Sequence, residues 1–112
     1  MPLNIRYEGD IAILSNIGRS MNDPRYVDAG REVTDLLDEG LRKFVIELRG
    51  VRETGSPLLG LLMTMTRQIR QRGGEVVLAS LSRGMEQFLA EMQMEEFWDT
   101  FRSVEEAKES LD

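Results

Sequence analysis

The chain of 112 residues is 41% hydrophobic and 30% charged, which is the size and composition of one globular domain with one core. It contains no cysteine and no histidine, which excludes disulfides and thiolate chemistry and argues against a hydrolase triad or a zinc site. The net charge of -6 argues against nucleic acid or anionic lipid as the main partner.

The sequence predicts a cytoplasmic protein that does not insert directly into a membrane. No apolar run approaches roughly 20 residues, the length of a membrane-spanning helix. Residues 1–4 show no basic region followed by an apolar stretch, so we expect no secretory signal. We also expect no cofactor, because the sequence contains no motif specific for one.

The first part of the chain predicts a β-hairpin followed by a helix. Two short apolar segments, residues 5–7 and 11–14, flank a tight turn at residues 8–10. Residues 22–24 (Asn-Asp-Pro) have the pattern of a helix start, with a capping side chain followed by a proline. Apolar residues at helical spacing continue that helix, which we expect to stop before Gly40.

The middle of the chain alternates predicted buried strands with a predicted helix. Residues 43–48 are almost entirely apolar, as expected of a central strand. A helix is predicted from Pro57 to about Arg72, because one apolar stripe recurs at helical spacing through Leu58, Leu62, Met65 and Ile69. The pair Gly73-Gly74 ends that helix, and residues 75–79 form the next buried strand.

The last third of the chain predicts two short helices and an edge strand. Ser82 caps a helix whose apolar residues are interpreted as core together with Trp98: Met85, Phe88, Leu89 and Met92. Residues 97–101 are a candidate for the last edge strand. Ser103 and Glu106 fit a capping box that opens a final helix to Leu111.

This order of elements predicts an α/β fold, a mixed sheet of about four to five strands covered by about four helices. Successive strand–helix–strand crossovers should be right-handed. Because no linker, repeat or low-complexity segment is visible, residues 1–112 are expected to form a single domain.

Several stretches carry a resemblance to a known family: Tyr7–Leu14, Phe44–Val51, Leu59-Gly60 and Arg72–Leu78. On these residues the chain resembles a STAS domain, the fold of bacterial anti-sigma factor antagonists, over nearly its whole length. Family members often carry Asp-Ser-Ser-Gly-Leu-Gly after the central strand, and the first serine there accepts a phosphate. By position, the resemblance assigns that role to Ser56.

The sequence around Ser56 departs from the family pattern and leaves two interpretations open. Gly55 replaces the acid that could orient the serine hydroxyl, and Pro57 removes a backbone N–H that could hold a phosphate. Ser56 is then either a phosphoacceptor at a helix start or a simple N-cap with Pro57 at the first helical position. Thr54 is a second hydroxyl in the same loop.

Other residues also have a functional and a structural interpretation. Leu59 and Met63 lie off the main stripe, and they either form an apolar strip for a partner or widen the buried face of the helix. A basic cluster at the end of that helix either complements its dipole and aids solubility, or forms a site for a phosphate or an acidic partner: Arg67, Arg70 and Arg72. The carboxylates Glu95, Glu96 and Asp99 are interpreted as solvated, because they lack the loop spacing of a cation site.

The leading hypothesis is a regulatory, non-enzymatic protein-binding domain. It would sequester an anti-sigma factor with serine kinase activity, as the resemblance implies, with phosphorylation of Ser56 as the potential control. Its candidate partner-binding residues are Gly55, Pro57, Leu59 and Met63. The alternative is a non-switching STAS scaffold subunit of a signalling or lipid-transport assembly, and a nucleotide or lipid sensor is a third option. The sequence permits a dimer without requiring one.

Overall fold

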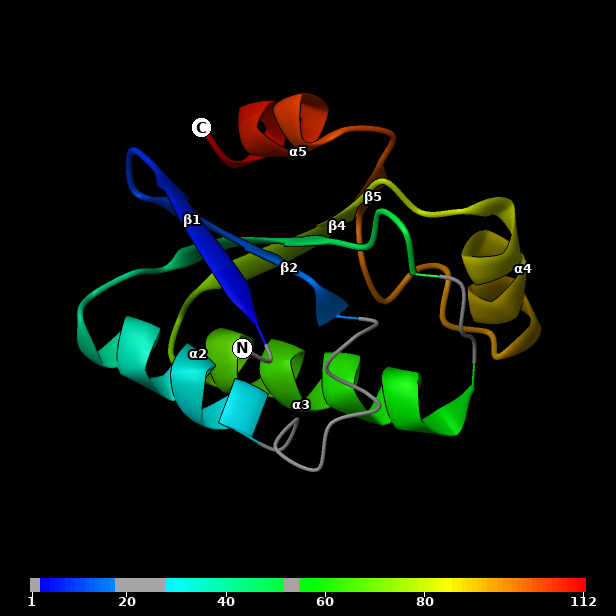
Figure 1. Ribbon diagram of the computed structural model, residues 1–112, viewed down its shortest axis with the longest axis horizontal. Helices are drawn as coiled ribbons and strands as arrows, with labels where there is room; N and C mark the ends of the chain where they lie inside the picture. The colour runs from blue at the N-terminus through cyan, green and yellow to red at the C-terminus, as the bar shows by residue number, and fades with distance from the viewer. Residues whose placement is uncertain (1–2, 18–27, 52–54) are drawn as a thin grey trace.

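The computed structural model describes residues 3–17, 28–51 and 55–112 (Figure 1). Their elements are β1 (Asn4–Glu8), β2 (Ile11–Ser15), α2 (Asp28–Asp38), β3 (Lys43–Glu47), α3 (Ser56–Gln71), β4 (Glu75–Ala79), α4 (Arg83–Glu91), β5 (Thr100–Phe101) and α5 (Val104–Leu111). The predicted helix start at residues 22–24 lies outside the described residues. The prediction that the following helix stops before Gly40 is confirmed, because α2 ends at Asp38.

The five strands form one mixed sheet in the order β1-β2-β3-β4-β5. The hairpin strands β1 and β2 pair antiparallel, with Tyr7 opposite Ala12. The remaining pairs are parallel, as the intervening helices require: β2 with β3, β3 with β4, and β4 with β5. The predicted mixed α/β sheet is therefore confirmed, with five strands and four described helices.

The sheet separates two groups of buried side chains. The larger core joins one face of the sheet to α2, α3 and α4, and it includes Phe44, Leu62 and Trp98. The smaller core joins the opposite face to α5 through residues such as Val45 and Ala107. Figure 1 shows α5 on one side of the sheet and α2 and α3 on the other. Strand side chains alternate between these two cores because successive residues of a strand point to opposite faces.

The apolar stripe predicted for α3 faces the larger core. All four of its residues are fully buried: Leu58, Leu62, Met65 and Ile69. The helix ends where the sequence predicts, because Gly73 takes a left-handed backbone (φ 81°). Gly74 is required for a different reason, since a Cβ there would stand 2.8 Å from Ile69 Cγ2 and 2.9 Å from the Arg42 carbonyl oxygen.

Serine side chains cap the last two helices as predicted. The Met85 backbone N–H donates to Ser82 Oγ over 3.1 Å, and the Glu106 N–H donates to Ser103 Oγ over 3.1 Å. Each bond satisfies a donor that a helix start leaves without an intrahelical partner. Within the part of the chain that the structure describes, no helix is long and apolar enough to cross a membrane.

The predicted edge strand at residues 97–101 is mostly wrong, because β5 contains only Thr100 and Phe101. The two preceding aromatic residues turn inward and meet edge to face, with ring centroids 4.7 Å apart. Trp98 is 2% exposed and lies in the larger core.

Candidate protein-binding surface

The carboxyl ends of the parallel strands form the edge of the sheet from which the connections to the helices leave. After each of three neighbouring strands one residue adopts a left-handed backbone: Asn16 (φ 68°), Gly50 (φ 81°) and Ser80 (φ 61°). Such a conformation is unfavourable for residues other than glycine and is enriched at functional sites. Ligands of open parallel sheets also bind at the carboxyl edge. This edge, together with the start of α3, is therefore the first place to look for a binding site.

The loop after β3 enters α3 one residue earlier than the sequence suggests. Gly55 occupies the N-cap position with φ 153° and ψ 177°, a combination nearly restricted to glycine. Its carbonyl accepts the Leu59 N–H over 3.1 Å. Ser56 is thus the first helical residue, and its prediction as the N-cap is wrong. Pro57 follows in the first turn, where its missing N–H needs no intrahelical acceptor. Thr54 lies outside the described residues.

From its first turn onward, α3 presents an exposed face flanked by apolar side chains. Pro57, Gly60 and Thr64 are exposed along this face. Leu59 and Met63 are half-buried and pack against the larger core, so they widen the buried face and are only partly available to a partner. These residues lie at the N-cap and in the N-terminal half of α3, and we call Gly55, Pro57, Leu59, Gly60 and Met63 the α3 surface.

Packing within the fold does not explain why a glycine occupies position 60 of this surface. Beyond its own helical turn, no described atom lies within 4 Å of the position that a Gly60 side chain would take. A glycine inside a helix costs about 1 kcal/mol relative to alanine. Because the chain has room for a side chain here, the glycine brings no benefit to packing within the described residues. The sequence showed the Leu59-Gly60 pair but could not reveal that this position is open.

The three arginines near the end of α3 do not converge on one point. Arg70 donates to the Phe97 carbonyl over 2.8 Å, and its guanidinium lies 4.7 Å from the centre of the Phe97 ring. Arg72 pairs with Asp38 at 2.7 Å, whereas Arg67 is exposed. Two of the three side chains therefore fasten α3 to neighbouring segments, which favours the structural interpretation of the cluster.

A buried polar contact that the sequence did not reveal anchors the segment after α4. Trp98 Nε1 donates to Thr66 Oγ1 on α3 over 2.8 Å, and Thr66 is fully buried. An indole N–H in a core needs an acceptor, so the lone tryptophan was the signal that such a partner exists. The contact links the buried side of α3, the helix that carries the α3 surface, to the segment after α4.

The core prediction for α4 holds for three of its four residues. Met85 and Leu89 are buried, and Phe88 is half-buried against the larger core. Met92 is 46% exposed, so its prediction as core is wrong. The helix ends at Glu91 and Met92 is its C-cap, which takes the side chain off the helical stripe.

The acidic residues after α4 do not form a cation site. Glu95, Glu96 and Asp99 are exposed. In residues 3–17, 28–51 and 55–112, no group of carboxylates is placed to hold a metal ion. These exposed carboxylates give the segment a negative surface.

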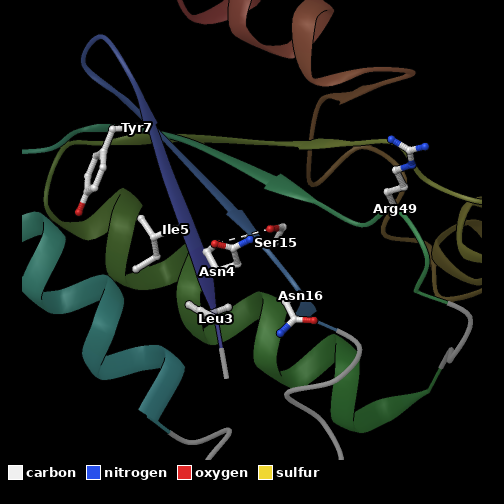
Figure 2. Close-up of a pocket in the computed structure, with 7 residues that line it drawn as sticks. All are labelled: Leu3, Asn4, Ile5, Tyr7, Ser15, Asn16 and Arg49. Atoms are coloured by element: carbon white, nitrogen blue, oxygen red, sulfur yellow. Dashed lines mark hydrogen bonds between the residues drawn. The ribbon is translucent and has the colours of Figure 1, made fainter. Parts of the chain in front are cut away.

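Figure 2 shows an open hollow beside β1, lined by residues of β1 and β2 together with Leu3, Asn16 and Arg49. Its lining mixes apolar and polar side chains, and Arg49 and Tyr7 are exposed. A shallow hollow of this kind differs from the enclosed, mainly apolar pockets that take small molecules. It does not point to a specific ligand.

On the opposite face, an ion-pair network fastens the hairpin to α5. The Lys108 ammonium contacts Glu8 Oε1, and Arg6 Nε lies 3.1 Å from Glu8 Oε2. The hydrogen bond from Lys108, followed by that from Arg6, lowers the pKa of the Glu8 carboxyl. The same bond to Glu8 raises the pKa of Lys108. The network therefore favours the charged forms of both groups.

Comparisons with solved structures find the same fold in bacterial proteins. The Thermotoga maritima protein TM1081 is 22% identical, with 96% of this chain and 86% of that chain covered and a TM-score of 0.84. An anti-sigma-factor antagonist (STAS) domain protein from Planctomyces limnophilus is 20% identical over 97% of each chain, with a TM-score of 0.80. The phosphorylated Bacillus cell fate determinant SpoIIAA is 12% identical over 98% of this chain and 99% of that chain, with a TM-score of 0.72. At these identities the likeness establishes the fold.

A comparison with curated proteins found no match. The family comparison is more informative, since the model of the STAS domain matches residues 16–107, well over half of the chain. That range includes β3, α3 and the whole α3 surface. The chain belongs to the STAS domain family.

Proposed function

We propose that this protein is a non-enzymatic regulatory subunit that binds a partner protein through the α3 surface. The carrying observation is Gly60, a helical glycine facing open space. Glycine allows another backbone to approach a helix closely, and the fold has no other evident use for it here. Leu59 and Met63, half-buried on the same helix, would supply the apolar contact area. We extend the proposal to residues 1–112 acting as one cytoplasmic domain.

The proposed partner is an anti-sigma factor with serine kinase activity. Support comes from family membership and from the structural neighbour described as an anti-sigma-factor antagonist. Sequestering such a factor would release its sigma factor, so binding alone would produce the regulatory effect. No catalytic group is needed in this mechanism.

Phosphorylation of Ser56 would control the docking. Ser56 opens α3, where the positive end of the helix dipole favours an anion, and the first turn carries no acidic residue of its own. A phosphate would add about -1.5 to -2 charges in the middle of the α3 surface. The added charge and volume would weaken an apolar, close-fitting contact.

A specific observation supports the alternative, a scaffold subunit without a phosphate switch. Gly55 stands where the family carries an acid, and its backbone conformation is nearly closed to any residue with a side chain. Pro57 also removes one of the N–H groups available to a phosphate. These features suit permanent packing of the α3 surface in an assembly better than they suit a phosphate switch.

The docking proposal is tested with Gly60→Gln, which adds a side chain into the open space. First, the tagged protein is used to capture partners from its own cell lysate, with and without ATP, and they are identified by mass spectrometry. Affinity for the purified partner is then compared among the wild type, Gly60→Gln and Ser110→Gln. Ser110 is exposed on α5 across the sheet, so its variant is a matched control for added bulk.

We expect Gly60→Gln to weaken binding at least tenfold while raising stability by a few tenths of a kcal/mol, since the new residue favours the helix. The control should bind as the wild type does. Equal affinity of all three proteins would contradict docking at this surface. ATP-dependent release with phosphate on Ser56 supports the switch, whereas a complex that ATP leaves intact and unphosphorylated supports the scaffold.

A further inference from the structure

We propose that two copies of this chain associate through β1, joining their sheets edge to edge. β1 is the first strand in the sheet order, and in the part of the chain that the structure describes it pairs with β2 alone. The other edge of such a strand presents N–H and C=O groups that can pair with a further strand. β1 is also the most exposed strand of three or more residues, with Asn4, Arg6 and Tyr7 all exposed.

The side chains of β1 divide cleanly between the two faces of the sheet. Arg6 and Glu8 lie opposite Ile13 and Ile11 of β2, which belong to the smaller core under α5. Ile5 and Tyr7 lie on the other face, and Figure 2 shows both leaving β1 on the side of α2 and α3. Tyr7 is 53% exposed, the largest exposed fraction of any large hydrophobic residue among those described.

This pattern is complementary to itself in one register. If two β1 strands run antiparallel about a two-fold axis at Tyr7, Arg6 of each copy stands opposite Glu8 of the other. The two Tyr7 rings then face each other on the side of α2 and α3. Opposite charges and aromatic pairs are the favourable cross-strand combinations. Arg6 and Glu8 are two positions apart, so their backbone N–H and C=O groups point to the same side of β1. This register is therefore possible whether the hydrogen-bonded pairs of the new ladder are formed by Arg6 and Glu8 or by Tyr7.

The neighbouring symmetric registers are unfavourable. Moving the axis to Arg6 places two arginines opposite each other, and moving it to Glu8 places two glutamates opposite each other. Like charges directly across a ladder are destabilising. The contact between Arg6 Nε and Glu8 Oε2 at 3.1 Å shows that these two charges already lie together on one face. Glu8 also contacts the Lys108 ammonium of its own chain, so the cluster at the interface would contain three charged groups from each copy. A second copy of this chain is therefore the occupant that the edge fits best.

The association should be weak, because a five-residue strand buries much less than the roughly 1,200 Å² typical of stable complexes. We expect dissociation constants on the order of hundreds of micromolar. The paired β1 strands lie at the sheet edge, whereas the α3 surface lies in the helical layer. A dimer would carry two copies of the α3 surface. The dimer proposal does not depend on whether that surface binds the proposed partner.

The test is sedimentation velocity over a concentration series for the wild type, Arg6→Glu, Glu8→Arg and an equimolar mixture of the two variants. Each variant alone places like charges opposite each other, so its association should fall about tenfold. The mixture restores opposite charges across the interface and should associate as the wild type does. Arg31→Glu, an exposed substitution on α2 with the same change in net charge as Arg6→Glu, should have no effect.

Hydrogen exchange of the wild type gives a second readout that needs no variant. Amides of β1 should exchange more slowly at high protein concentration than at low concentration, while those of β5 should be unchanged. A wild type that stays monomeric up to about 1 mM would overturn the proposal. So would a variant mixture no more associated than its components, or β1 exchange that is independent of concentration.

Discussion

The hydrogen bond between Trp98 and Thr66 gives the sharpest stability prediction. Replacing Thr66 with valine keeps the side-chain shape but removes the acceptor, 2.8 Å from the indole nitrogen. Trp98 is 2% exposed and Thr66 is fully buried, so water cannot replace the lost partner. Leaving a buried N–H unsatisfied costs about 1–3 kcal/mol. Thr66→Val should therefore lower the free energy of unfolding by that amount.

A double-mutant cycle isolates the bond from packing changes. Phenylalanine at position 98 has no N–H, so Thr66→Val should be nearly neutral in a Trp98→Phe background. Unfolding in urea, followed by circular dichroism, gives the free energy for all four proteins without relying on the single tryptophan. A coupling energy of about 1 kcal/mol or more is expected. The same cost for Thr66→Val in both backgrounds would refute the argument.

Three further predictions test other parts of the fold. Gly74→Ala should destabilise the protein by about 1–3 kcal/mol in urea unfolding, because its Cβ would stand 2.9 Å from the Arg42 carbonyl oxygen. Gly55→Asp, which restores the family's acid, should cost about 1–3 kcal/mol because the backbone conformation excludes a side chain. Stability from Glu8 should be present above its ordinary pKa and lost as pH falls through the lowered folded pKa. Lys108→Met should reduce that acid loss in unfolding curves measured at several pH values. For Lys108 the sign is opposite, since its raised folded pKa makes its contribution disappear only as pH rises through that value.

Much of the fold follows from patterns that operate over a few residues. The α3 stripe is predicted because four apolar residues recur at helical spacing, and each of them is buried. The caps at Ser82 and Ser103 are predicted because a hydroxyl before a helix accepts a backbone N–H three residues later. These sequence patterns predict the structure correctly because they depend only on local geometry.

The errors have three different causes, and only one of them is a contact distant in sequence. Trp98 leaves the predicted strand because its indole bonds to Thr66, 32 residues earlier in the chain. Met92 leaves the predicted core because α4 stops one residue before it. The N-cap of α3 is Gly55 and not Ser56, because Gly55 adopts a backbone conformation that only glycine favours and that helix propensities do not predict.

The candidate site could be located from sequence, but its character could not. Family resemblance placed Ser56 and its neighbours before the helix that follows the central strand, and in the structure Ser56 is the first residue of α3. The half-burial of Leu59 and Met63 and the open space at Gly60 depend on how α3 packs, so they emerge only in three dimensions. The three arginines predicted as a basic cluster do not form one site, because Arg70 and Arg72 contact residues of other segments. These contacts also depend on packing and could not be seen in the sequence.

The most direct test of the central claim is a hydrogen-exchange footprint of the purified complex with its captured partner. Docking through the α3 surface predicts slowed exchange along the first two turns of α3 and in the residues just before it, with no change in α5. Residues Leu58 to Thr64 report this region, since Pro57 has no amide hydrogen of its own. Protection confined to α5 or to the sheet edge, with α3 exchanging as in the free protein, would contradict docking through the α3 surface.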